Sequence, residues 1–306
     1  MIRIWGCTMS SMDIRIIRSI FLNWPFEKGK GLLMKIFFPY LRRKNFRFEL
    51  QNGVTIPGQP IDEYITKWMF IHGYQKELEF AMTHSLIRNG DVILDIGANM
   101  GLWSMIPAAI HGPKIKIHAF EPVPELFHKL IENIKENKID SSYITYNIAL
   151  SETDGELIFN RDNNNSGMGY ISSVADPSFD QIKIQSKVLS DIRKNHRIDK
   201  VDFVKIDVEG AELQVLRGDK NLFMNDHAPL LTIEVIDENQ KRFGHSSNEL
   251  IQQLIDWGYK LSYLNESIGR LEDFDINSIG IDVHNVLAYK AHHLDRLKQL
   301  LNKPSH

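Results

Sequence analysis

The chain has 306 residues, of which 43% are hydrophobic and 25% charged, and its formal net charge is −3 at pH 7. These values are those of an ordinary globular protein with a sizeable core, and the near balance of charge argues against a nucleic-acid partner. A single cysteine, Cys7, excludes an internal disulfide bond, and no Cys/His cluster has zinc-site spacing. No apolar run approaches the roughly 20 residues of a membrane span, and residues 1–12 lack the apolar length of a signal peptide. We therefore expect a cytoplasmic protein.

Residues 1–60 are expected to form an N-terminal extension of helices and a hairpin. Residues 14–22 are apolar with interspersed arginines, and residues 31–44 are apolar with a basic end. One interpretation is a helical cap on the main domain, whose basic residues lie near a helix C-terminus for dipole reasons. The other is a basic amphipathic segment, within residues 14–44, that associates peripherally with a membrane or covers a lipid-bearing acceptor. Residues 46–56 predict a β-hairpin.

Helical and strand patterns alternate through a main domain that we place at residues 61–295. Helices are predicted at 63–70 and 75–87, before the first strand. The expected strands of the main sheet are 92–96, 115–120, 143–148, 201–206, 230–236, 259–264 and 284–289. This alternation predicts one doubly wound, mostly parallel α/β sheet with helices on both faces. The last residues, 296–306, are expected to form a polar C-terminal tail.

The segment between the third and fourth of these strands departs from the alternation. Residues 156–160 and 182–188 have strand patterns, whereas residues 161–173 are rich in Asn, Gly and Ser and predict a loop. We therefore expect an excursion from the main sheet in this region.

The first strand of the main sheet ends in the turn Asp95-Ile96-Gly97-Ala98-Asn99-Met100-Gly101. A strand, a glycine-bearing turn and an apolar helix open a nucleotide-type α/β unit, and ligands bind at the carboxyl ends of such strands. Asn99 stands where a dinucleotide fingerprint requires its second glycine, which argues against NAD or FAD. The chain also lacks a phosphate-binding Gly-Lys-Ser/Thr motif. The turn therefore suits a ligand that carries a ribose but no phosphate.

Glu121 ends the second strand, 20 residues after Gly101. From this position in a doubly wound sheet, a carboxylate reaches the hydroxyl groups of a bound ribose. An isolated Glu-Pro pair after a strand is usually only a turn. Because it follows the glycine turn, we interpret Glu121 as a ribose ligand.

Charged residues interrupt two strands that should be apolar, since a central parallel strand is covered on both faces. Lys205 and Asp207 lie in the fourth strand with Glu209 just beyond it, and Glu234 interrupts the fifth strand in the same way. Burying such charges costs several kcal/mol unless partners meet them. They are either an ion pair that holds the sheet together or part of a site. Their position beside the first strand, at the switch point of the sheet, favours a site.

Several motifs together resemble the FkbM-type S-adenosylmethionine-dependent methyltransferases, which have a class I, Rossmann-like fold. They are residues 92–101 with the Asp-Ile-Gly-Ala-Asn-x-Gly pattern, 119–122, 147–151, 201–212 and 216–218. The resemblance extends over roughly residues 73–290. It implies a seven-stranded sheet whose last strand is antiparallel. It also implies that residues 161–195 are a variable insertion on the acceptor side.

The resemblance also assigns residues to the cofactor, S-adenosyl-L-methionine. It implies that Asp95, Gly97, Asn99 and Gly101 cradle the methionine part and that Glu121 holds the ribose. It further implies that Ala149 and Leu150, after the third strand, border the adenine.

The implied reaction is methylation of a hydroxyl group on a sugar, a glycan or another small molecule, including a lipid-linked precursor. A hydroxyl is a poor nucleophile until a base removes its proton in the transition state. Asp207 and Glu209 are our candidate bases, with Glu234 behind them. Lys205 would orient a carboxylate or, as a neutral amine, accept the proton itself.

Three alternatives stay open on the sequence alone. Asp207 and Glu209 would suit a divalent cation such as Mg²⁺, although two acids on one strand argue for it only weakly and we do not favour it. A non-catalytic cofactor-binding module inside a biosynthetic complex is disfavoured, because such a module has no reason to retain buried charges. An NAD-dependent oxidoreductase is disfavoured by Asn99.

Overall fold

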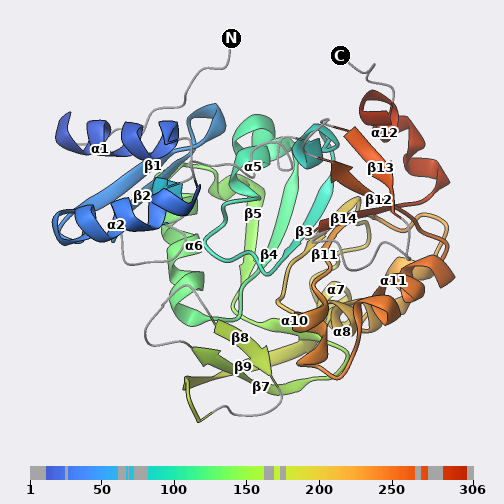
Figure 1. Cartoon of the computed structure of the whole chain (residues 1–306). Coiled ribbons are helices and arrows are strands. Elements are labelled where there is room, and N and C mark those ends of the chain that lie inside the picture. The colour runs from blue at the N-terminus through green and yellow to red at the C-terminus, as the bar shows by residue number, and fades with distance from the viewer. Residues whose placement is uncertain are drawn as a thin grey trace.

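A central β-sheet organises the molecule in the computed structural model, which is drawn in Figure 1. The structure describes residues 12–24, 27–60, 67, 69–71, 82–161, 169–172, 177–265, 270–274 and 285–301. The sheet has eight strands in the order β13-β12-β14-β11-β10-β3-β4-β5. In chain order these are β3 (Val92–Ile96), β4 (Lys116–Phe120), β5 (Tyr143–Tyr146), β10 (Phe203–Ile206), β11 (Leu230–Glu234), β12 (Lys260–Asn265), β13 (Arg270–Asp273) and β14 (Asn285–Tyr289).

The strand directions confirm the predicted doubly wound, mostly parallel sheet. Strands β5, β4, β3, β10 and β11 are parallel neighbours, whereas β14 runs antiparallel to both β11 and β12. All seven predicted strands are therefore present, with the last one reversed. The structure adds β13, which pairs antiparallel with β12 at the edge of the sheet. After β3, the next two strands in the chain, β4 and β5, lie on one side of it in the sheet, whereas β10 lies on its other side. The strand order therefore reverses between β3 and β10, which flank the switch point.

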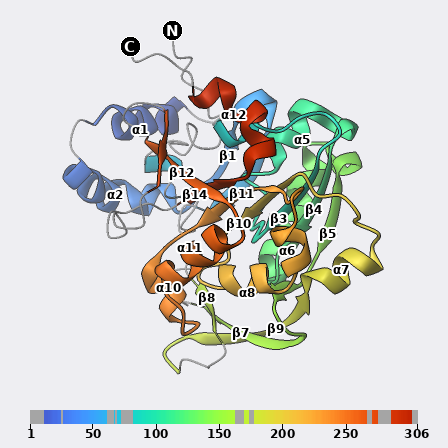
Figure 2. The same cartoon turned by 90° about the vertical axis from the view of Figure 1, so that its right-hand side faces the viewer.

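Helices cover both faces of this sheet, as Figure 2 shows from the side. The helices whose bounds the structure gives in the main domain are α5 (Met105–His111), α6 (Pro124–Glu136), α7 (Leu189–Asn195), α8 (Glu212–Arg217), α9 (Lys220–Met224), α10 (Asp237–Lys241), α11 (Ser247–Asp256) and α12 (Leu294–Leu301). Adjacent residues of β3 enter two separate buried clusters: Ile93 belongs to the cluster that contains Leu130 of α6, and Leu94 belongs to the cluster that contains Leu213 of α8. Apart from Asp95 and Lys205, the central strands β3 and β10 are apolar on both sides because both faces are covered.

A second sheet corrects our expectation for the region after β5. Its four strands are β6 (Ala149–Ser151), β7 (Gly155–Arg161), β8 (Gly169–Ser172) and β9 (Asp180–Val188), arranged in the order β6-β9-β7-β8. The excursion therefore begins at Ala149, before the strand pattern at 156–160 with which we expected it to start. Part of the predicted loop 161–173 is a strand, because β7 supplies antiparallel partners for β8. Residues 162–168 and 173–176 lie outside the described part of the chain.

The N-terminal part consists of two helices, α1 (Met12–Asn23) and α2 (Glu27–Leu41), and a two-stranded ribbon, β1 (Asn45–Glu49) with β2 (Thr55–Pro60). Figure 1 shows the helices in blue, beside the ribbon and at one side of the main sheet. Phe21 is fully buried, and its ring lies 5.6 Å from that of Phe70 and 6.3 Å from that of Phe37. Most of the predicted helices 63–70 and 75–87 lies outside the described residues.

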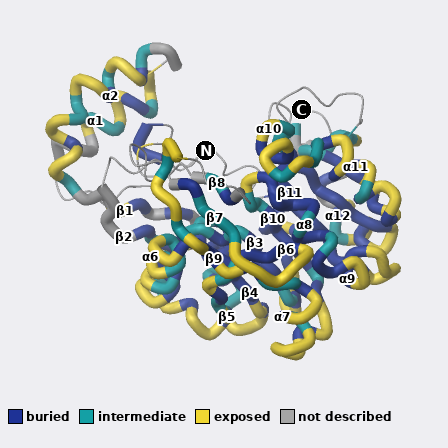
Figure 3. The backbone as a smooth tube through the Cα atoms, turned by 90° about the horizontal axis from the view of Figure 1, so that it is seen from below, coloured by how far each residue is buried: buried dark blue, intermediate teal, exposed yellow. Residues whose placement is uncertain are grey.

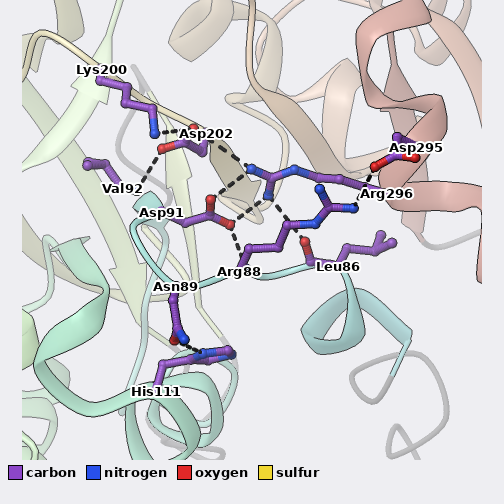
Figure 4. A network of polar contacts seen from close by, with 10 residues as sticks. All are labelled: Leu86, Arg88, Asn89, Asp91, Val92, His111, Lys200, Asp202, Asp295 and Arg296. Atoms are coloured by element: carbon purple, nitrogen blue, oxygen red, sulfur yellow. Dashed lines mark hydrogen bonds and ion pairs between the residues drawn. The ribbon is translucent and has the colours of Figure 1, made fainter.

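The C-terminal segment is a folded helix where we expected a tail at 296–306. Arg296 of α12 donates two hydrogen bonds to Asp91, of 2.6 and 2.7 Å, in the network of Figure 4. The same guanidinium lies 3.8 Å from Asp202, whose other oxygen accepts the Val92 backbone N–H at 2.9 Å. This network joins α12 to the amino ends of β3 and β10, so it fixes the two strands that flank the switch point at the edge opposite their turns. Residues 302–306 lie outside the described range.

Candidate active site

The predicted site residues meet at the carboxyl edge of the parallel strands. Asp95 is in β3, Glu121 directly follows β4, Asp207 directly follows β10, and Glu234 is the last residue of β11. In the sheet register Lys205 of β10 lies beside Asp95 of β3. Because parallel strands present their carboxyl ends at one edge, side chains far apart in sequence converge there.

The glycine turn after β3 is held tightly against its neighbours. Gly97 has a φ of 78°, and a Cβ atom there would lie 1.8 Å from the backbone oxygen of Asp207. Gly97 and Ala98 donate their N–H groups to the carbonyl of Phe120, at 3.0 and 2.9 Å. A glycine is therefore required at position 97 because the turns after β3 and β10 touch.

The other two turn residues have separate packing reasons. Asn99 adopts a left-handed φ of 52°, which asparagine tolerates better than most side chains. At Gly101, with a φ of 89°, a Cβ atom would lie 2.7 Å from Leu130 of α6. The glycine at position 101 therefore allows α6 to pack closely against this turn.

Lys205 is the cation at the centre of this edge. Its Nζ atom donates to the carbonyl oxygen of Gly97 at 2.8 Å and lies 3.2 Å from Asp207 Oδ2 and 3.7 Å from Asp95 Oδ1. Burial lowers the pKa of Lys205, but the charges of Asp207 and Asp95 outweigh burial and raise this pKa above its usual value. Lys205 is thus an ammonium that pairs and orients carboxylates. The second sequence hypothesis, a neutral Lys205 amine that accepts a proton, does not fit these contacts.

Asp95 is completely buried beside this ammonium. No donor in the part of the chain that the structure describes lies within ordinary hydrogen-bond distance of its carboxylate oxygens, although the Lys205 ammonium at 3.7 Å and the Ser104 hydroxyl face them. Burial raises the pKa of Asp95, and the Lys205 charge opposes this rise. A buried carboxylate normally has hydrogen-bond donors, so Asp95 has acceptor capacity that a ligand could use.

Glu121 is held rigidly between two turns. Its Oε2 accepts the N–H of Asn99 at 2.8 Å, and its Oε1 accepts the N–H of Val123 at 2.9 Å. Burial raises the pKa of Glu121 to about 7, although these two backbone donors oppose the rise. Each carboxylate oxygen can accept more than one hydrogen bond, so the group retains capacity for ligand hydroxyls.

Three carboxylates form a cluster next to Lys205. Oxygens of Asp207, Glu209 and Glu234 all lie within 4.8 Å of one another. Asn239 of α10 donates to Glu209 at 2.9 Å and to Glu234 at 3.3 Å. Oxygen ligands at such separations could hold a hard divalent cation. Asn239 was missed in the sequence because no motif marks it.

Glu212 was also missed as a structural residue of the site. It is fully buried, and its Oε1 accepts the N–H groups of Val208 and Gly210, at 3.0 and 3.2 Å. Gln240 donates to its other oxygen. Burial raises the pKa of Glu212 to about 7, despite these donors. Glu212 therefore fixes the turn that carries Asp207. The acid in the motif after β10 was visible, but its role depends on the folded turn.

Ala149 and Leu150 lie in β6 of the second sheet, whereas the acidic residues of the site lie at the edge of the main sheet. Both are buried, and in the register they pair with Ser186 and Lys187 of β9. They enter two different buried clusters. Their predicted place beside an adenine ring stays a prediction.

The fold is that of a Rossmann-like α/β protein, and the candidate site lies at the switch point of its sheet. Residues 95–261 match the model of the methyltransferase FkbM domain. That match covers more than half of the chain, so the chain belongs to the FkbM methyltransferase-domain family. The resemblance inferred from the motifs is thereby confirmed.

Three named relatives share about three residues in ten with the chain. Methyltransferase sdnD of Sordaria araneosa is 29% identical over 41% of this chain and 59% of its own length. Hexuronic acid methyltransferase AglP of Haloferax volcanii is 31% identical over 43% of this chain and 51% of its own. 31-O-demethyl-FK506 methyltransferase FkbM of Streptomyces tacrolimicus is 29% identical over 43% and 60%, respectively. The chain thus spans only about half to three fifths of these relatives.

Solved structures show more distant likenesses. A human methyltransferase 10 domain containing protein is 11% identical, with a TM-score of 0.43 over 91% of this chain and 96% of that one. Aeropyrum pernix fibrillarin, solved with S-adenosyl-L-methionine, is 16% identical, with a TM-score of 0.38 over 80% and 93%. These likenesses are too remote to carry an argument about function. Among the described residues, no helix combines the length and apolar character needed to cross a membrane.

Proposed function

We propose that this chain is an S-adenosyl-L-methionine-dependent O-methyltransferase that acts on a hydroxyl group of a sugar, a glycan or another small molecule. The observation that carries the proposal is the meeting of Asp95, Glu121, Lys205 and Asp207 at one edge of the sheet. Family membership supports methyl transfer. One relative is named for a hexuronic acid, which carries both hydroxyls and a carboxylate, and another for 31-O-demethyl-FK506, a name that indicates methylation of an oxygen; together they support an oxygen acceptor on a sugar or another small molecule.

The residues at this edge fit the cofactor. S-adenosyl-L-methionine carries an ammonium and a sulfonium, and the buried carboxylate of Asp95, which Lys205 and Ser104 face without a close hydrogen bond, has acceptor capacity left. The cofactor also has ribose hydroxyls, and Glu121 is a rigid acceptor with capacity left. We assign the methionine end to Asp95, Gly97, Asn99 and Gly101. The ribose is assigned to Glu121, and the adenine border to Ala149 and Leu150. When bound, the cofactor supplies an electrophilic methyl group.

The chain must then orient an acceptor hydroxyl and take up its proton. We assign the base to Asp207, because its side chain is 36% exposed while Lys205 holds it from the buried side at 3.2 Å. Glu209 and Glu234 lie close enough to receive or share a proton. Positioning of the acceptor by the same rigid turn would supply much of the remaining rate enhancement.

A cation at the cluster of Asp207, Glu209 and Glu234 is the alternative way to activate the hydroxyl. A bound Mg²⁺ would lower the pKa of an acceptor hydroxyl and reduce the need for a protein base. Treatment with a chelator followed by re-addition of Mg²⁺ distinguishes the two. Activity that survives exhaustive chelation supports Asp207 as base, whereas loss and recovery with Mg²⁺ supports the cation.

The proposal is tested by separating cofactor binding from turnover. Calorimetry with S-adenosylmethionine, S-adenosylhomocysteine and NAD should show binding of the first two only. Turnover is measured as release of S-adenosylhomocysteine with a panel of uronic acids, neutral sugars and their glycosides. Asp207→Asn should keep the cofactor affinity within about twofold but lower kcat by roughly 10²–10⁴, the usual contribution of a general base.

The matched control is Asp226→Asn, since Asp226 is an exposed acid after α9. It should leave both measurements unchanged. If neither S-adenosylmethionine nor its product binds, the proposed function is wrong. If the cofactor binds and Asp207→Asn turns over normally, only the assignment of the base is wrong.

A further inference from the structure

Two exposed apolar stripes run along the N-terminal helices α1 and α2. Each stripe repeats every four residues, so the members within a helix lie on one side of it, and Trp24 directly follows the end of α1. We call them together the N-terminal apolar surface; its residues and exposed fractions are Ile16 (56%), Ile20 (36%), Trp24 (37%), Leu32 (64%), Ile36 (62%) and Tyr40 (39%). Figure 3 shows exposed segments along both helices.

These residues are not needed for attachment of the helices to the domain. The helices are attached through Phe21, Met34 and Leu41 instead, which are 0–4% exposed and belong to the main hydrophobic cluster. Helices α1 and α2 also contact each other. A helix on a globular protein usually has polar residues on its outward side. Here large apolar side chains stand outward beside a core-facing side that is already packed.

The same segment concentrates positive charge. Residues 12–44 contain eight lysines and arginines but two acids, although the whole chain has a net charge of −3. Lys35, Arg42 and Arg43 of this segment are exposed, next to the stripe of α2. This composition is typical of a helical surface that lies in a membrane interface, where apolar side chains are joined by tryptophan, tyrosine and flanking basic residues.

We propose that the N-terminal apolar surface docks on an anionic lipid bilayer. The helices would lie along the interface, with the apolar stripes in the headgroup region and Lys35, Arg42 and Arg43 on anionic headgroups. A second copy of the chain fits this surface less well. A two-fold interface would place the same positive segment against itself, and protein interfaces are depleted of lysine at their centre. The inference does not depend on the proposed reaction.

The experiment is sedimentation of the full chain with vesicles, without cofactor or acceptor. Vesicles of phosphatidylcholine with phosphatidylglycerol should bind the protein, and vesicles of phosphatidylcholine alone should bind it more weakly. Leu32→Glu/Ile36→Glu should reduce partitioning roughly tenfold or more, because two large apolar side chains no longer enter the interface. Arg42→Glu/Arg43→Glu should reduce binding to the anionic vesicles only, and 1 M salt, with a Debye length of about 3 Å, should weaken wild-type binding.

The matched control is Met224→Glu/Ile255→Glu, which changes exposed apolar residues of α9 and α11 that are 53% and 42% exposed. These helices lie at the other side of the molecule in Figure 3. Control and test variants should show the wild-type Tm and affinity for S-adenosylhomocysteine. The proposal is overturned if wild type ignores anionic vesicles, or if Leu32→Glu/Ile36→Glu binds them as wild type does. It is equally overturned if that variant only dissociates a dimer.

Discussion

The buried Glu121 carboxyl predicts a measurable pH dependence of stability. Its pKa is raised by burial from 4.5 to about 7 in the folded protein. A raised pKa means that the folded state binds the proton more tightly than the unfolded state does. Glu121 therefore stabilises the fold fully below pH 4.5, and this contribution is lost as the pH rises through 7.

The size of the effect follows from the same shift. One pKa unit corresponds to 1.36 kcal/mol, so ionisation of Glu121 between pH 5 and pH 8 should lower the free energy of unfolding by about 2 to 3 kcal/mol. Glu121→Gln removes the titration. It also replaces one carboxylate oxygen by an amide NH₂ group. The backbone N–H of Asn99 or of Val123 then faces a donor and loses its hydrogen-bond acceptor. That mismatch should cost about 1–3 kcal/mol at every pH.

Urea unfolding of wild type and Glu121→Gln at pH 5, 6, 7 and 8 measures both effects. The variant should be less stable at pH 5, and the difference should shrink or change sign toward pH 8. The control is Glu132→Gln on α6, an exposed acid, which should follow the wild-type profile. Parallel profiles for wild type and Glu121→Gln would refute the raised pKa. At pH 8 calorimetry should also show at least roughly tenfold weaker binding of S-adenosylmethionine, through the lost ribose acceptor.

Three further substitutions test separate parts of the site and its support. Lys205→Met leaves Asp95 buried without a cation and should lower the free energy of unfolding by about 3–5 kcal/mol; urea unfolding within 1 kcal/mol of wild type would contradict the pairing. Arg296→Met breaks the bidentate contact with Asp91 and should cost a similar ~3–5 kcal/mol, yet calorimetry should show unchanged cofactor affinity, because this contact is at the opposite edge of the sheet. Gly97→Ala places a Cβ atom against a backbone oxygen at a positive φ and should cost at least ~3 kcal/mol; calorimetric melting near the wild-type Tm would disprove that close contact.

The fold could be predicted best where burial determines the pattern of apolar residues along the chain. The strands 92–96 and 203–206 are apolar apart from Asp95 and Lys205, because helices cover both faces of the sheet, so they were predicted within about two residues. The acids at their carboxyl ends could be grouped for the same reason, since parallel topology brings these ends together.

Features that depend on distant partners could not be predicted. Strand β8 lies in an Asn/Gly/Ser-rich segment and exists because β7 offers it hydrogen bonds. The polar sequence after residue 295 resembles a tail, but Arg296 finds Asp91, some 200 residues earlier. The roles of Glu212 and Asn239 likewise arise from a turn and a short helix that meet only in the folded chain.

The two sequence interpretations of Lys205, a structural ion pair and a site residue, describe the same set of contacts. Its ammonium bonds the Gly97 carbonyl and pairs with Asp95 and Asp207, so it ties the turn after β3 to the turn after β10. Those two turns carry the proposed cofactor ligands and the proposed base. Any substitution at Lys205 should therefore change stability and turnover together, whereas Asp207→Asn should change turnover alone. Unfolding and kinetic assays of both variants therefore distinguish a residue that holds the two turns together from a residue that takes part in the reaction.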